Sequence, residues 1–262
     1  MEAYRRLAAT AAGRVIATVE APDPWYLKGG LSPAAARAAL VGRTLAGARR
    51  IGKVLLLDTG GDTGGDTGGD GPVVGLRFGM TGRLLVDGRA GVGRLRYGGS
   101  QDRPAWDRFA LRFAGGGDLV VRDPRRLGGV CLDPREGALG PDVLALTGAR
   151  LRAVLASSAP LKARLLDQAA LAGVGNLLAD EALWRAGLDP RRPACSLNPV
   201  EARRLLRHLP ATVAQLAERG GSHTGDLMAE RRPGGHCPRD GSPLARTTVG
   251  GRTTWWCPAH QR

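Results

Sequence analysis

The chain has 262 residues, enough for two ordinary domains, and its hydrophobic fraction of 43% is typical of a globular protein. No apolar run reaches membrane-spanning length and no secretory leader opens the sequence, so we expect a cytoplasmic protein with no membrane partner. Its 38 Lys and Arg outnumber 24 Asp and Glu, and the net charge of +14 indicates a polyanion as partner, nucleic acid before acidic lipid.

Residues 1–134 are predicted to form a short helix followed by many short strands. Residues 2–12 carry apolar side chains at helical spacing beside a basic face. Gly, Pro and Asp separate six candidate strands, at 14–19, 44–57, 72–78, 82–86, 109–113 and 119–122. Short strands with frequent turn signals favour a β-sandwich or barrel.

A repeat lies between the second and third of these strands. Asp58-Thr-Gly-Gly occurs three times, ending at Gly69. A segment of Gly, Asp and Thr cannot bury an apolar core, so we expect an expanded surface loop at the tip of a hairpin.

From about Pro141 the pattern changes to helices, at 142–146, 150–157, 176–186 and 199–219. A connector at 231–235 then leads into the last segment. The sequence therefore predicts an α+β protein in three parts: a β-sandwich domain at 1–134, a helical domain at 135–230 and a small hairpin at 231–262.

The last segment carries two pairs of metal-ligand residues. Each pair has two residues between its members, and sixteen residues separate the pairs. This spacing suits a structural zinc ion held tetrahedrally by a hairpin. The predicted ligands are Cys237, Asp240, Cys257 and His260.

Two other interpretations of the hairpin stay open. His236 offers a substitute ligand if Asp240 does not coordinate, because a carboxylate makes the ligand set unusual. Alternatively, the hairpin binds no metal and is held by Trp255 and Trp256.

Four ordered motifs carry a resemblance to a known family. The segment 165–190, which contains Ala172-Gly-Val-Gly-Asn176, resembles the helix–two-turn–helix of the formamidopyrimidine-DNA glycosylase/endonuclease VIII family. Phe78-Gly-Met-Thr-Gly82 and Asp123-Pro-Arg-Arg126-Leu resemble its two DNA-probing loops. The spacing in the last segment is similar to that of its zinc finger, which ordinarily has four cysteines.

The resemblance implies a role for each matching residue. Lys53 would contact a phosphate near the lesion and assist β-elimination, and Arg252 would clamp the flanking phosphates and assist the second elimination. Met80 would fill the space left by the extruded nucleotide. The remaining implied contacts are those of Arg125 and Leu127 with the orphaned base and those of Lys162 and Asn176 with phosphates.

Taken singly, these residues have simpler explanations. Met80 and Leu127 would then be core residues, and Lys53 and Arg252 solvated strand positions. The motifs around them favour the functional interpretation, because an apolar wedge and a planar cation suit a kinked, unstacked duplex.

The implied activity is that of a DNA glycosylase and AP lyase of base-excision repair, which acts as a monomer, associated with the nucleoid, on double-stranded DNA with damaged bases or abasic sites. The alternative is a catalytically impaired protein of the same fold that binds damaged or abasic DNA. A general zinc-hairpin transcription or ribosome-associated factor is a third interpretation, which the internal motifs disfavour.

The chain departs from the family pattern in two places. The family's leader, Pro-Glu-Leu-Pro-Glu-Val, supplies the nucleophilic proline amine, whereas Met1 stands here at the position of the leader's Val. A misassigned GTG start codon would explain this difference. The loop that caps 8-oxoguanine also looks trimmed between Gly220 and Cys237, which weakens the case for 8-oxoguanine and leaves oxidised pyrimidines or ring-opened purines open as substrates.

Overall fold

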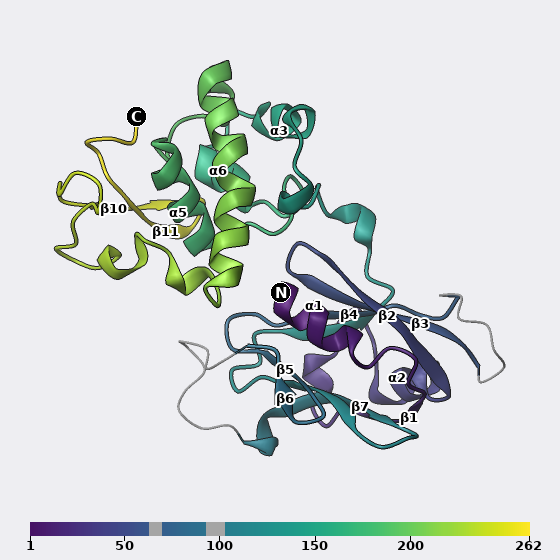
Figure 1. Cartoon of the computed structure of the whole chain (residues 1–262). Coiled ribbons are helices and arrows are strands. Elements are labelled where there is room, and N and C mark those ends of the chain that lie inside the picture. Colours follow the sequence, from purple (N-terminus) through teal and green to yellow (C-terminus); the bar gives the residue numbers. More distant parts are fainter. Residues whose placement is uncertain (63–69, 93–102) are drawn as a thin grey trace. The chain divides into compact units, whose positions relative to one another are not determined.

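The computed structural model describes residues 1–62, 70–92 and 103–262, and the chain divides into two compact units, Met1–Glu136 and Gly137–Arg262 (Figure 1). The described residues of the first unit form a β-sandwich with two short α-helices, and the second unit holds the other α-helices and the last hairpin. The predicted α+β class is thereby confirmed. The boundaries of the three-part division stay a prediction. Among the described residues, no helix has the length and apolar character needed to cross a membrane.

Two antiparallel sheets form the first unit. One has five strands in the order β1-β7-β8-β5-β6 and the other four in the order β2-β3-β4-β9. Two helices accompany them, α1 (Glu2–Ala9) and α2 (Pro33–Leu40). The strands are β1 (Ile16–Glu20), β2 (Arg43–Ile51), β3 (Val54–Asp62), β4 (Val74–Arg77), β5 (Arg83–Val86), β6 (Arg89–Ala90), β7 (Asp107–Phe113), β8 (Asp118–Arg122) and β9 (Gly129–Leu132).

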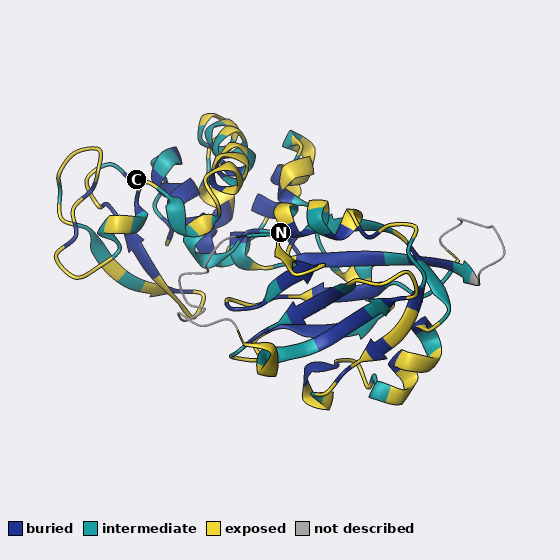
Figure 2. Ribbon diagram, turned by 60° about the horizontal axis from the view of Figure 1, so that its bottom comes forward, coloured by how far each residue is buried: buried dark blue, intermediate teal, exposed yellow. Residues whose placement is uncertain are grey.

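Alternating strand residues build the core of this unit. In β7, Phe109, Leu111 and Phe113 point inward, and in β3 Leu55 and Leu57 do so from the opposite sheet. This period of two follows from the pleat, which sends successive side chains to opposite faces. The buried stretches follow the strands in Figure 2. One apolar core therefore joins both sheets and the inward faces of the two helices.

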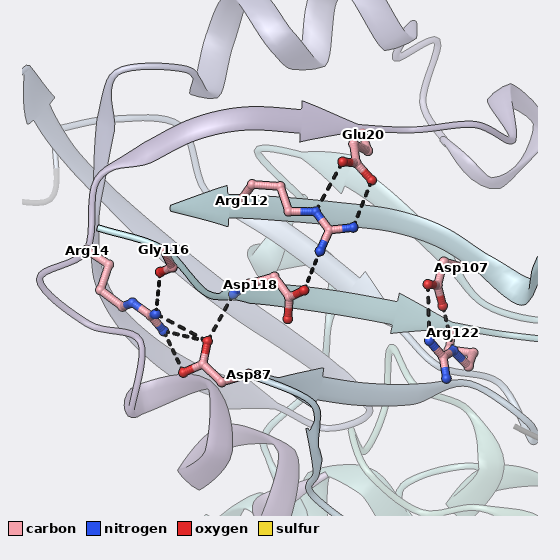
Figure 3. A network of polar contacts seen from close by, with 8 residues as sticks. All are labelled: Arg14, Glu20, Asp87, Asp107, Arg112, Gly116, Asp118 and Arg122. Atoms are coloured by element: carbon pink, nitrogen blue, oxygen red, sulfur yellow. Dashed lines mark hydrogen bonds and ion pairs between the residues drawn. The ribbon is translucent and has the colours of Figure 1, made fainter. Parts of the chain in front are cut away.

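Ion pairs cover the outer face of the five-stranded sheet (Figure 3). Arg112 pairs with Glu20 on β1, with 3.1 Å between Nε and Oε1, and also with Asp118 on β8. Arg122 reaches Asp107, its partner in the strand register, at 2.5 Å. Such cross-strand pairs favour one register, although partly exposed pairs contribute only about 0.2–1 kcal/mol each.

The prediction of one strand at 44–57 is wrong in one respect: this segment forms two strands joined by a turn. Strands β2 and β3 pair from Ile51 and Val54 outward, and the two-residue turn between them is Gly52-Lys53. Gly52 has a φ of +57°, which matches the first central position of a type II′ turn. The segment contains two glycines, Gly47 and Gly52, and only the second marks the turn, which puts the Lys53 side chain on the surface.

Other differences in this unit are smaller. Helix α1 ends three residues earlier than predicted, and α2 and β9 were not predicted. Strand β3 includes the first Asp-Thr-Gly-Gly repeat, residues 58–61, and ends at Asp62. Most of the remaining repeat, residues 63–69, lies outside the described residues.

The second unit contains four α-helices within its described part, α3 (Gly148–Leu155), α4 (Leu161–Leu166), α5 (Asn176–Ala186) and α6 (Pro199–Glu218). Helix α5 has the predicted bounds. Helix α6 begins at a capping box in which the side chains of Asn198 and Glu201 each bind the other's backbone N–H. Leucines, valines and alanines of all four helices share a core with the turns between them.

The last hairpin pairs β10 (Ala245–Val249) with β11 (Arg252–Trp256). Its turn is Gly250-Gly251, with φ values of +57° and +70°, as a type I′ turn requires. A Cβ on Gly250 would lie 2.9 Å from the Cβ of Ala163, so the turn packs closely against α4. Arg252 follows the turn directly and is exposed.

One buried carboxylate ties together three segments of the first unit. Asp123 has no exposed surface and accepts hydrogen bonds from the hydroxyls of Thr81 (2.5 Å) and Tyr26 (3.2 Å). It also accepts the backbone N–H groups of Arg125 and Gly128. The segments around residues 26, 81 and 123–128 are thereby fixed to one another.

We expect Asp123→Ala to lower the free energy of unfolding by roughly 3 kcal/mol, because it leaves several buried hydrogen-bond donors without an acceptor. Glu20→Ala, which removes an exposed carboxylate from Arg112, should cost no more than about 1 kcal/mol. Denaturant unfolding of both variants checks this. Equal, small losses would show that Asp123 does not organise the loops.

Candidate functional site

Four potential metal ligands converge in the last hairpin. One ligand atom from each of Cys237, Asp240, Cys257 and His260 lies within 4.8 Å of the other three. The set is the one expected from the spacing. His236 is exposed and is not in the group, so among the described residues Asp240 is the fourth member.

The separations between these atoms match the edges of a tetrahedron. Zinc bonded at 2.0–2.3 Å to sulfur, nitrogen and oxygen gives edges of about 3.5 Å for S···N and S···O and about 3.3 Å for N···O. Cys237 Sγ lies 3.4 Å from His260 Nδ1, and Cys257 Sγ lies 3.3 Å from Asp240 Oδ2. His260 Nδ1 and Asp240 Oδ2 are 3.1 Å apart. The residues therefore fit a tetrahedral ion.

The imidazole of His260 is oriented for ligation. Its Nε2 lies 3.1 Å from the carbonyl oxygen of Trp184, which can only accept a hydrogen bond. A proton on Nε2 leaves Nδ1 of the neutral ring with a lone pair directed at Asp240 and Cys237. Metal-binding histidines commonly donate their second N–H in this way.

Burial raises the pKa of the Cys257 thiol to about 11. Since zinc binds the thiolate, metal binding here would release the thiol proton.

A second buried carboxylate organises the helical unit. Asp180, on α5, lies 2.7 Å from Lys162 Nζ on α4 and 2.6 Å from a guanidinium nitrogen of Arg231. It also accepts the backbone N–H of Trp255 at 3.2 Å. The side chains of Asp180 and Lys162 have no exposed surface, so their charges compensate each other away from water.

This arrangement corrects the expectation that Lys162 holds a phosphate. Besides Asp180, its Nζ donates to the carbonyl oxygen of Thr253 (3.0 Å) and to the hydroxyl of Thr254 (2.8 Å). Burial lowers the pKa of Lys162, and Asp180 opposes that effect. A fully buried ammonium cannot reach a phosphate, so Lys162 holds the hairpin strand β11 against α4 and α5.

Asn176 acts on the same strand. It is the first residue of α5, and its Nδ2 donates to the carbonyl oxygen of Thr253 at 3.1 Å. Lys162 and Asn176 therefore bind one carbonyl, adjacent to Arg252. The structure thus brings Lys162, Asn176 and Arg252 together. Lys162 and Asn176 fix the strand, and Arg252 is exposed beside them.

The predicted residues of the first unit lie on its surface. Met80 is 54% and Leu127 44% exposed, which excludes the simpler interpretation of both as core residues. Their loops touch: if Gly79 carried a Cβ, this atom would lie only 2.7 Å from the Cβ of Leu127. Arg125 and Lys53 are exposed as well.

The sequence interpretation missed the residues that fix these positions. Asp123, Asp180 and Arg231 were not singled out, although Asp180 stands among the apolar residues of a helix, where a buried acid signals a partner. Tyr26 was missed also, and nothing nearby in the sequence marks its link to Asp123.

Comparison with known proteins supports one family across both units. Residues 1–130 match the model of the formamidopyrimidine-DNA glycosylase N-terminal domain, and residues 139–227 that of the formamidopyrimidine-DNA glycosylase H2TH domain. Formamidopyrimidine-DNA glycosylase of Cereibacter sphaeroides is 34% identical, over 100% of this chain and 98% of its own. The Geobacillus kaustophilus protein of that name is 31% identical, over 95% and 93%.

Solved structures show the same fold. The LlFpg protein in complex with THF-DNA and an inhibitor has a TM-score of 0.79 at 23% identity, covering 100% of this chain and 97% of that one. Lactococcus lactis Fpg with DNA containing an abasic site has a TM-score of 0.78 at 22% identity, with the same coverage. With full-length relatives above 30% identity and both domains matched, the chain belongs to the formamidopyrimidine-DNA glycosylase family.

Proposed function

We propose that this chain is a DNA glycosylase of base-excision repair with AP lyase activity, acting on oxidised or ring-opened bases in double-stranded DNA. Family membership supports the glycosylase activity. The observation that carries the proposal is the pair of touching loops in the first unit, where Met80 and Leu127 are exposed although apolar. Folding gains nothing from this exposure, whereas an unstacked duplex offers apolar surface for both.

In the first unit, the two loops would recognise the distorted duplex. Met80 would occupy the space of the extruded nucleotide, and Arg125 and Leu127 would contact the orphaned base. Unstacking costs a few kcal/mol per base step, least at a damaged pair, so wedge residues favour lesions over intact DNA. Asp123 keeps both loops in place before DNA arrives.

The lyase step would use cations beside the leaving phosphates. An amine of the enzyme would attack the sugar C1′, where the damaged base, or the hydroxyl of an abasic site, leaves as the Schiff base forms. Loss of a C2′ proton then breaks the C3′–O bond and expels the phosphate. Lys53 and Arg252 would stabilise the charge that develops on the departing oxygens. Each stands at a two-residue hairpin turn, where a long side chain extends into solvent. Asn176 would contribute a further phosphate contact from the start of α5.

A structural zinc ion would be held by Cys237, Asp240, Cys257 and His260. When bound, it cross-links the two ends of the hairpin, a role suited to a segment too small for a core of its own. The ligands do not face a substrate; what they fix is the fold that presents Arg252. We further propose that the protein acts as a monomer on DNA in the cytoplasm, at the nucleoid.

Metal analysis should find about one zinc per chain. Cys257→Ala and Asp240→Ala should lose the metal and most DNA binding, because the hairpin would unfold, whereas the control His236→Ala should keep both. Elemental analysis and gel-shift assays measure this. Metal loss in His236→Ala with retention in Asp240→Ala would reverse the ligand assignment.

Lys162→Met should lower the free energy of unfolding by about 3 kcal/mol, since it removes a partner from a buried carboxylate. Arg164→Met, on the same helix, removes a partly exposed ion pair with Asp167 and a hydrogen bond to the Val154 carbonyl, and should cost less, about 1–2 kcal/mol. Denaturant unfolding compares the two. Unchanged stability together with a shallower salt dependence of DNA binding would indicate a phosphate contact instead.

Arg252→Gln should slow cleavage of abasic DNA about 10- to 100-fold at unchanged melting temperature, because an exposed charge is removed from the leaving phosphate. Arg246→Gln, exposed on the paired strand β10, is the matched control. Borohydride trapping on the same DNA should yield a covalent adduct whose peptide identifies the amine. Binding without any adduct would contradict the lyase assignment.

A further inference from the structure

Trp25 presents an indole to solvent on the first unit. Its side chain is 58% exposed, the largest value among the exposed large apolar residues described in that unit. The other tryptophan described in this unit, Trp106, is only partly exposed. A tryptophan contributes most when buried, so folding does not explain this placement.

The backbone on both sides of Trp25 is anchored. It lies in a 3-10 turn, η1 (Pro24–Tyr26), that ends at the fully buried Tyr26, whose hydroxyl binds Asp123. The N–H of Lys28 donates to the carbonyl oxygen of Val130 at 2.7 Å. The indole is therefore held outward by a fixed turn.

Two cations flank the ring. Both lie over the indole: Lys28 Nζ is 3.6 Å and Arg126 Cζ 4.8 Å from the ring centroid. Lys28 Nζ also donates to the carbonyl oxygen of Trp25. Asp23 pairs with Arg126 at 2.7 Å and is also near Arg108, so cations outnumber carboxylates in this cluster. Lys28 is one of only three lysines in the chain.

The cluster adjoins the two loops described above. Arg126 directly precedes Leu127, and a Cβ on Gly129 would lie 2.8 Å from the Cγ of Lys28. A Cβ on Gly128 would lie 2.3 Å from the Tyr26 hydroxyl. Trp25 therefore belongs to the same surface as Leu127, which in turn touches the Met80 loop.

We propose that Trp25, Lys28 and Arg126 form an additional DNA-binding site that holds an unstacked nucleotide beside the lesion. A base that stacks on the indole takes the place of Lys28 over the ring, and the two cations then pair with the adjoining phosphates. Aromatic stacking with cations is the chemistry by which proteins hold unpaired nucleotides without reading their sequence. The proposal deepens the proposed function and rests on it, because it assumes that the loops of this unit engage damaged DNA.

Equilibrium binding of the full-length protein tests the site, with a duplex that contains a tetrahydrofuran abasic-site analogue and the matched intact duplex. Trp25→Ala should weaken binding of the abasic duplex about 5- to 100-fold, the range for loss of one stacked base. The loss on the intact duplex should be much smaller. Trp25→Phe should retain most of the affinity, and Val41→Ala, another exposed apolar residue of this unit, should bind like wild type.

Two further measurements separate stacking from general attraction. DNA should quench the fluorescence of wild type more than that of Trp25→Phe. Lys28→Gln and Arg126→Gln should each lower the slope of log affinity against log salt by about one.

Wild-type-like binding of the abasic duplex by Trp25→Ala, or an equal loss on both duplexes, would overturn the site. If wild type itself binds neither duplex, the proposed function fails instead. Melting temperatures equal to wild type would confirm that the variants are folded.

Discussion

The presentation of Arg252 depends on one buried ion cluster. Asp180 accepts from Lys162, Arg231 and the backbone of Trp255, and so connects two helices, the connector and the hairpin at a single carboxylate. The Lys162–Asp180 pair is shielded from bulk solvent, because neither side chain is exposed. Removing one partner of such a pair typically costs about 3–5 kcal/mol, so the hairpin is held in one position. The strand that carries the exposed Arg252 is therefore already ordered before the protein meets DNA.

The first unit repeats this solution with Asp123, which binds hydroxyls and backbone N–H groups in place of cations. In both units a buried acid fixes the backbone while the side chains that would meet DNA remain outside. This division explains how exposed residues such as Met80 and Trp25 keep defined positions: their neighbours, not they, contribute the stability. It also separates the effects of mutation, since changes at the two carboxylates alter folding and changes at the surface alter binding.

Local patterns in the sequence were enough to predict much of this protein. The bounds of α5, the presence of strands β7 and β8 and the metal group at 237–260 all depend on neighbours within a few residues or on a pair of tight turns. Burial of a lysine is not local. Lys162 was expected at a phosphate because the family resemblance implies that role, whereas its partners Asp180 and Thr254 are distant in sequence. The hairpin at Gly52 was missed because a second glycine, Gly47, lies inside strand β2, so a glycine in this segment did not by itself mark the turn.

The ligand set of the last hairpin has a consequence for the conditions under which the protein can work. Oxidants attack sulfur in steps, from sulfenic to sulfonic acid, and each step removes a thiolate from a metal site. With zinc bound as proposed, only Cys237 and Cys257 offer sulfur, and both are buried, while Asp240 and His260 are far less readily oxidised. A site with four thiolates has twice as many atoms to lose. With zinc bound, this hairpin would therefore keep its metal longer under oxidative stress than a hairpin with four thiolates.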